Sequence, residues 1–149
     1  MTELIEYEKQ MQGEVEAFFR ICLPDSGRNY EPEGRHRYLQ HPESNFMKFW
    51  VLRADGQVIG TVALKRLEDD RCCELKCLYV HRDFQRKGYG GWLLDTAVDY
   101  ARSCSFEWIY LDTLRTSKNA AMLYRKRGFS ETERYNQNQV ADLFMRRKL

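Results

Sequence analysis

The sequence predicts an α+β fold of the three-layer α/β type, with helices flanking a mixed, mostly antiparallel central sheet of about six to seven strands. Two observations predict it. Residues 46–80 contain three apolar segments separated by short polar turns, a pattern typical of an antiparallel meander. Residues 92–104 have helical spacing and lead into a further apolar segment. The strands before and after this helix should therefore lie parallel through a right-handed crossover.

Length and charge limit the possible classes of protein. The 149 residues are expected to form a single domain, 1–149, because this length is near the commonest domain size. The 24 Lys and Arg residues are balanced by 22 Asp and Glu, which argues against a nucleic-acid partner. No stretch approaches the roughly 20 apolar residues of a membrane span, so no membrane partner is expected.

The cysteines predict neither disulfides nor a metal site. Their number is odd and the N-terminus lacks the features of a secretory signal, so we expect reduced thiols in a cytoplasmic protein. Cys73 and Cys77 have no second Cys or His pair at the spacing of zinc ligands. The other cysteines are Cys22, Cys72 and Cys104.

The N-terminal third begins with a weak strand pattern at residues 3–8 and an amphipathic helix from Lys9 to Cys22. Pro24 opens a turn cluster, so the helix is expected to end before it. Residues 25–45 are polar, with a short helix around 34–41. They form either a variable surface connection or one wall of a pocket for an acceptor substrate.

The meander consists of predicted strands at Phe46–Arg53, Val58–Leu67 and Cys72–Val80. The turn Ala54-Asp55-Gly56-Gln57 joins the first two, and its Asp-Gly pair suits type I′ geometry. A polar turn follows Leu67, and the third strand completes the meander.

The C-terminal half begins with the helix Trp92–Cys104, whose apolar stripe should cover the sheet. Residues 106–113 follow as a buried strand, and a second helix is expected at 118–127, with Gly128 at its C-terminal end. Two closing strands are expected near 129–136 and 141–148.

The segment Gln85–Gly91, Gln-Arg-Lys-Gly-Tyr-Gly-Gly, joins a predicted strand to a predicted helix. Glycines let the backbone turn tightly, and the first turn of the helix offers free N–H groups and a positive dipole end. Both favour a diphosphate site. A dinucleotide fingerprint fits poorly because Leu93 occupies the position of its third glycine, and no Gly-Lys-Ser/Thr of a Walker loop is present.

These motifs resemble the GCN5-related N-acetyltransferase (GNAT) superfamily. Gln85, Gly88 and Gly90 match that family's (Gln/Arg)-x-x-Gly-x-(Gly/Ala) signature. The resemblance extends from about Val51 to the C-terminus, and the N-terminal helix also fits it. The other matching motifs are Leu78-Tyr79-Val80, Leu123-Tyr124 and Gly128-Phe129.

The resemblance implies binding of acetyl-CoA as co-substrate, without a metal, and acyl transfer to an amine. Strand residues Leu78, Tyr79 and Val80 would pair with the pantetheine arm like an added strand, between two splayed parallel strands. After the signature residue Gln85, the diphosphate would be held by the backbone amides of Arg86, Lys87, Gly88, Tyr89, Gly90 and Gly91.

Two residues match catalytic positions of the superfamily. Tyr124, four residues before Gly128, lies where the family keeps a general-acid tyrosine, although it could also be a core aromatic of its helix. Glu74, six residues before Val80, lies where one branch keeps a glutamate base. Strand alternation would place Glu74, Lys76, Leu78 and Val80 on one face. Burial would raise the pKa of Glu74, or the carboxylate could instead pair with a cation.

Ser117 marks a departure from the family pattern. Many relatives carry an asparagine seven residues before the tyrosine, and this chain has Ser117 there. Ser117 either replaces that contact with the co-substrate or caps the helix. Asn119 lies two residues further on, on a different part of a helix, so the asparagine role is not transferred to it.

The leading hypothesis is therefore an N-acetyltransferase that uses direct attack within a ternary complex of acetyl-CoA and a primary amine. The alternative is a non-catalytic acyl-CoA-binding regulatory module, which would share the diphosphate site. The acceptor is not identified, although residues 25–45 and 135–140 are expected to line its site. The resemblance also implies a possible homodimer.

Overall fold

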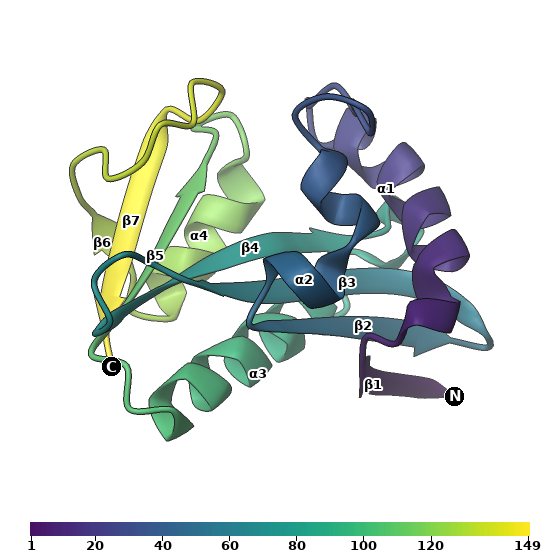
Figure 1. The fold of residues 1–149 in the computed structure, drawn as a ribbon, viewed down its shortest axis with the longest axis horizontal. Helices are drawn as coiled ribbons and strands as arrows, with labels where there is room; N and C mark the ends of the chain where they lie inside the picture. Colours follow the sequence, from purple (N-terminus) through teal and green to yellow (C-terminus); the bar gives the residue numbers. More distant parts are fainter.

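The computed structural model of the protein describes residues 1–149 and contains a seven-stranded mixed sheet (Figure 1). The strand order is β1-β2-β3-β4-β5-β7-β6, and only β4 and β5 are parallel. This confirms the predicted fold class. The strands are β1 (Thr2–Glu6), β2 (Lys48–Ala54), β3 (Gln57–Arg66), β4 (Cys72–Val80), β5 (Trp108–Thr113), β6 (Ser130–Glu131) and β7 (Leu143–Lys148).

Helices cover both faces of the sheet (Figure 1). One face carries α1 and a core of 12 buried residues that includes Phe19 and Phe49. The other face carries α3 and α4 over a core of 21 buried residues. The α-helices are α1 (Gln12–Asp25), α2 (Pro42–Asn45), α3 (Tyr89–Ser103) and α4 (Lys118–Lys126). The 3₁₀ turns are η1 (Lys9–Met11), η2 (Arg37–Gln40) and η3 (Arg82–Phe84).

No helix combines the length and the apolar composition needed to cross a bilayer.

The β2–β3 hairpin turn has the predicted geometry. Asp55 and Gly56 both adopt positive φ, 50° and 81°, as a type I′ turn requires. The Asp-Gly pair therefore sets the register of the meander, in which Ala54 faces Gln57.

Helix α1 runs past Pro24 to Asp25, so the prediction that it ends before the proline is wrong. The real terminator is Gly27, whose φ is 84°. The Gly27 N–H donates to the Pro24 carbonyl and the Arg28 N–H donates to the Leu23 carbonyl, both at 3.0 Å. These two bonds make a Schellman motif, which satisfies the last carbonyls of the helix and turns the chain toward residue 28.

Other boundaries also differ from the prediction. Helix α3 begins at Tyr89 instead of Trp92, so the last glycines of the segment 85–91 belong to its first turn. The expected strand at 129–136 shortens to Ser130–Glu131. Beyond it, residues 132–142 leave the sheet edge as a loop whose side chains reach back to β4 and β5. The helix expected at 34–41 is replaced by η2 and α2.

Candidate functional site

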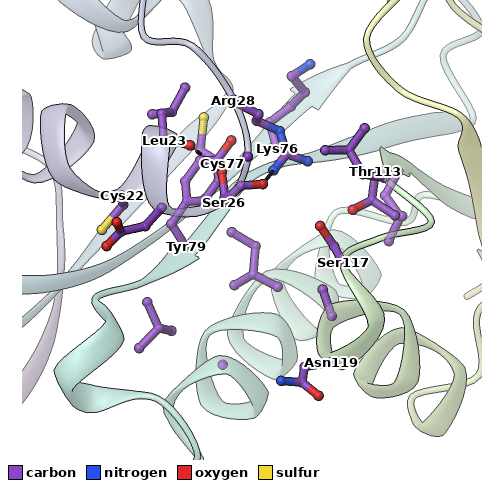
Figure 2. Close-up of a pocket in the computed structure, with 18 of the residues that line it drawn as sticks. Cys22, Leu23, Ser26, Arg28, Lys76, Cys77, Tyr79, Thr113, Ser117 and Asn119 are labelled. Carbon is purple, nitrogen blue, oxygen red and sulfur yellow. Dashed lines mark hydrogen bonds between the residues drawn. The ribbon is translucent and has the colours of Figure 1, made fainter.

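The parallel pair β4–β5 opens along its length. The two strands face each other over three residue pairs, from Cys72–Trp108 to Glu74–Tyr110. Beyond Glu74 the strands diverge, and the rest of β4 has no partner on the β5 side. A cavity of about 780 Å³ lies at this opening, between β4, β5, α4, the start of α3 and the chain after α1 (Figure 2).

A β-bulge at Cys77 directs the free half of β4. Thr61 faces Tyr79 while Ala63 faces Lys76, so β4 contains one residue more than β3 here. Cys77 has φ 58°, a left-handed conformation that is rare for residues other than glycine. The buried Thr61 hydroxyl donates to the Cys77 carbonyl at 2.7 Å, which helps to hold the bulge in place.

The bulge corrects the predicted strand faces. Simple alternation placed Glu74, Leu78 and Val80 on one face, and that prediction is wrong. Leu78 and Val80 pack on the α3 side of the sheet, whereas Tyr79 packs on the α1 side. The extra residue at Cys77 inverts the alternation, because one inserted residue exchanges the two faces of a strand.

The glycine segment presents consecutive free backbone donors. None of the six N–H groups from Arg86 to Gly91 donates to an acceptor within the protein, and the first helical bond runs from Trp92 to the Gly88 carbonyl at 3.1 Å. Gly88 occupies the N-cap with φ 88°, and nothing lies within 4 Å of where its Cβ would be. Several unpaired donors at a helix N-terminus fit the oxygens of a diphosphate.

The residues of the glycine segment 85–91 differ in what they contact. The Gln85 amide donates to the Val80 carbonyl at 2.9 Å and so ties the segment to the end of β4. Gly91 leaves room for Arg127, since an added Cβ would come within 2.6 Å of its guanidinium. Lys87 and Tyr89 do not line the cavity, and the Lys87 ammonium lies 5.6 Å from the Phe84 ring centroid instead.

Tyr124 is brought to the cavity by α4. It is only 6% exposed, packs edge-on against Phe129 and forms no hydrogen bond with the protein through its hydroxyl. Burial raises the pKa of the phenol, and the nearby Tyr79 adds to the shift. The hydroxyl therefore keeps its proton at neutral pH and can donate a hydrogen bond to a group in the cavity.

Glu74 is 4% exposed and is not among the residues that line the cavity. Its Oε2 accepts from the Tyr135 hydroxyl at 2.6 Å and from the Asn136 amide at 3.0 Å. The carboxylate is thus hydrogen-bonded to neutral donors from the 132–142 loop and is not paired with a cation.

Asp112, at the end of β5, lines the cavity. Its carboxylate accepts from the amides of Asn136 at 2.6 Å and Asn138 at 3.2 Å. Asn136 therefore joins Asp112 to Glu74. From the sequence we expected residues 135–140, which include both asparagines, to line the acceptor site, but we predicted no bonds from them to Asp112 or Glu74. The only signal was two amide residues, spaced two apart, in a polar segment between the closing strands.

Ser117 occupies the N-cap of α4, but its hydroxyl makes no capping bond. It lines the cavity together with Asn119 (Figure 2). Ser117 therefore occupies the expected cap position, but without the side-chain bond of a helix cap. Asn119 lies in the exposed first turn of α4 and also lines the cavity. The sequence did not predict this position.

The structure indicates neither a reactive cysteine at the site nor a metal site. All five cysteines are free, and burial raises the pKa of the Cys22, Cys73 and Cys77 thiols to about 12. Thiols in this state are poor nucleophiles at neutral pH. No group of three or more His, Cys, Asp or Glu side chains is placed to hold a metal ion.

Residues 14–129 match the family model described as the acetyltransferase (GNAT) family. The probable N-acetyltransferase camello of Xenopus tropicalis is 34% identical over 85 residues, which cover 56% of this chain and 39% of that protein. The chain thus spans well under two thirds of that relative's length.

Two solved structures have a similar fold. An acetyltransferase of the GNAT family from Staphylococcus aureus superimposes with a TM-score of 0.89 at 22% identity, over 99% of each chain. The PaiA N-acetyltransferase of Thermoplasma acidophilum, solved in complex with coenzyme A, gives a TM-score of 0.79 at 18% identity, over 100% of this chain and 99% of that chain.

Proposed function

Because the chain belongs to the acetyltransferase (GNAT) family, we propose that it transfers an acetyl group from acetyl-CoA to a primary amine by direct attack within a ternary complex. One observation carries the proposal: six consecutive free N–H groups, Arg86 to Gly91, lie beside the opening between β4 and β5. A diphosphate at this helix N-terminus would leave the attached arm free to run along β4 toward Tyr124. The coenzyme A in the Thermoplasma structure supports the same ligand class for this cavity.

Acetyl-CoA supplies the activated acetyl group as a thioester. The Arg86–Gly91 amides bind the diphosphate, Gln85 fixes this segment to β4, and Leu78 to Val80 offer the pairing edge. Ser117, with its hydroxyl free of a capping bond, adds a contact from the α4 side. These groups would hold the thioester carbonyl near the Tyr124 hydroxyl.

The amine nitrogen forms a bond to the carbonyl carbon as the carbon–sulfur bond breaks. The departing thiolate takes the Tyr124 proton, and the amine loses its own proton through water toward Glu74. The buried Tyr124 hydroxyl, which has no partner in the protein, favours turnover over simple binding.

The competing function is a non-catalytic acyl-CoA-binding regulatory module. The test is to incubate the protein with acetyl-CoA and a panel of amines and peptides while measuring free thiol. The proposal expects thiol release that depends on one class of amine. Calorimetric binding of acetyl-CoA without thiol release for any amine would support the module instead.

A further inference from the structure

Three cations line the end of the cavity away from the glycine segment: Arg28 after α1, Arg35 before η2, and Lys76 on β4. None of them lies within 4.0 Å of a carboxylate oxygen, although ten other cation–carboxylate pairs form across the protein. The Arg28 guanidinium donates only to the Ser26 carbonyl at 3.3 Å, and the Arg35 guanidinium only to Asn138 at 3.1 Å. The Lys76 ammonium makes no hydrogen bond with the protein.

The three cations converge on one region. Besides burial, which is the main cause, Arg35, Arg28 and Lys76 each help to lower the pKa of the buried His36, so all three lie close to that ring. Arg28 stacks 5.8 Å from the Tyr79 ring centroid and Lys76 lies 6.0 Å from that of Tyr38. Both cations are half-buried in the cavity lining, and each lies beside an aromatic ring; Figure 2 shows Arg28 and Lys76 close to Cys77.

A carboxylate lies near these cations, because Asn138 accepts from Arg35 and donates to Asp112. Asp112 has both oxygens bound by neutral amides and no cation partner. The other acidic residue of the lining, Asp25, lies 3.7 Å from Arg82. Arg28 and Asp112 are both near enough to Tyr124 to affect its phenol, in opposite directions. The region next to the general acid therefore contains both unpaired cations and a carboxylate.

We propose that the acceptor is an amine that also carries a carboxylate, as a free amino acid does. Its carboxylate binds Arg28 and Lys76, with Arg35 at the rim, and its amino group lies toward Asp112. An arginine matches the two oxygens of a carboxylate with paired donors, and both cations are partly shielded from water. A purely cationic polyamine would instead meet three positive charges. This inference rests on the proposed acetyl transfer.

Matched substrates test it: a panel of amino acids and the corresponding amino-acid amides, which differ only at the carboxylate. Free thiol gives kcat/KM for each. A lost charge-assisted contact changes affinity by roughly 10- to 100-fold, so the acids should exceed the amides by at least about tenfold. Arg28→Met and Lys76→Met should raise KM for the acids by a larger factor than KM for the amides. Amides that react as well as acids would overturn the inference while acetyl transfer stands.

Arg20→Met is the matched control, because Arg20 lies exposed on α1, pairs with Glu16 and does not line the cavity. It should leave the preference for acids intact. Binding is read separately by calorimetry on Tyr124→Phe protein saturated with CoA. If acids bind no more tightly than amides there, the carboxylate site is wrong. If acids do bind more tightly but no wild-type turnover is found with any amine, the site stands and only the proposed transfer fails.

Discussion

Tyr124 has two properties required of a proton donor to a thiolate: it lines the cavity, and its hydroxyl has no partner in the protein. Burial raises its pKa, so the phenol is protonated at neutral pH. Tyr124→Phe removes only the hydroxyl from this environment. We expect kcat to fall by roughly 100- to 10,000-fold, the usual range for a lost general acid or base. The Kd for acetyl-CoA, measured by calorimetry, should stay within about twofold. An unchanged kcat would remove Tyr124 from the mechanism.

Glu74 is a proposed base that reaches the amine only through water. Glu74→Gln keeps the shape and an acceptor for Tyr135, but removes the basic oxygen. We expect kcat/KM to fall by roughly 100-fold or more. The exposed Glu131→Gln, which affects only the pair with Arg115, is the control. If kcat/KM of Glu74→Gln matches wild type and only the melting temperature drops, Glu74 is structural.

His36 should make folding sensitive to acid. Its pKa is lowered by burial, and Arg35, Arg28 and Lys76 add to the effect against an opposing contribution from Glu31. Since the unfolded chain binds the proton more readily, stability is complete above the unfolded value of 6.5 and is lost as the pH falls below it. We expect the melting temperature to drop between about pH 7 and pH 5.

His36→Asn separates titration from packing. The asparagine oxygen can accept the Glu31 N–H that Nδ1 accepts at 3.0 Å, yet it does not titrate in this range. The acid-induced drop should become smaller in this variant and stay unchanged in His41→Asn, whose ring is exposed. Identical pH curves for wild type and His36→Asn would contradict the assignment.

Among the secondary-structure elements, β4 contains a bulge that one buried hydrogen bond helps to hold in place. Thr61→Val removes the hydroxyl that bonds the Cys77 carbonyl, with almost no change of volume. An unsatisfied buried carbonyl costs about 1–3 kcal/mol, so unfolding by urea should show a loss of that size. The KM for acetyl-CoA should also rise, because the bulge directs the pairing edge. Thr61→Ser, which keeps the hydroxyl, should keep the wild-type KM. Equal KM values for both variants would contradict this role of the bulge.

Those elements were predictable wherever local chemistry decides the structure. The hairpin at Asp55-Gly56 and the helix after Gly88 follow from backbone preferences of the residues themselves. Cys77 does not: no property of cysteine favours φ 58°, and the bulge exists because β3 and β4 are held in one register by the whole sheet. The predicted end of α1 at Pro24 was wrong for a different reason. Gly27, three residues later, is a second local signal and ends the helix more strongly.

The site was predictable in its donor half and not in its acceptor half. The glycine segment lies on contiguous residues with a recognisable spacing, and the structure gives them free N–H groups. Arg28, Lys76 and Asp112 come from three separate elements, and only tertiary packing brings them to one cavity. Asn136 is a similar case, because its bonds to Glu74 and Asp112 span 62 and 24 residues of chain.

Across the whole molecule, the cavity divides the sheet into two parts that share only three β4–β5 pairs. Strands β1–β4 supply the pairing edge on one side. Strands β5–β7 and α4 supply Asp112, Ser117 and Tyr124 on the other. A co-substrate that contacts both parts should therefore raise the free energy of unfolding of the whole domain. It should also slow the separation of β4 from β5. At a concentration of 100 Kd, binding adds about 2.7 kcal/mol. For a chain of this size, that corresponds to a melting temperature roughly 5–10 °C higher.

Gly88→Ala tests whether the glycine segment is responsible for that rise. Gly88 and Gly56 both have positive φ, 88° and 81°, with open space around the missing Cβ, so alanine imposes similar backbone strain at each. Both variants should lose about 1–2 kcal/mol without ligand. Only Gly88→Ala should also lose most of the rise with acetyl-CoA, because its strain distorts the diphosphate site. Hydrogen exchange should show wild-type protection gained at residues 75–80 and 86–92. A full rise in Gly88→Ala would mean that the diphosphate binds elsewhere.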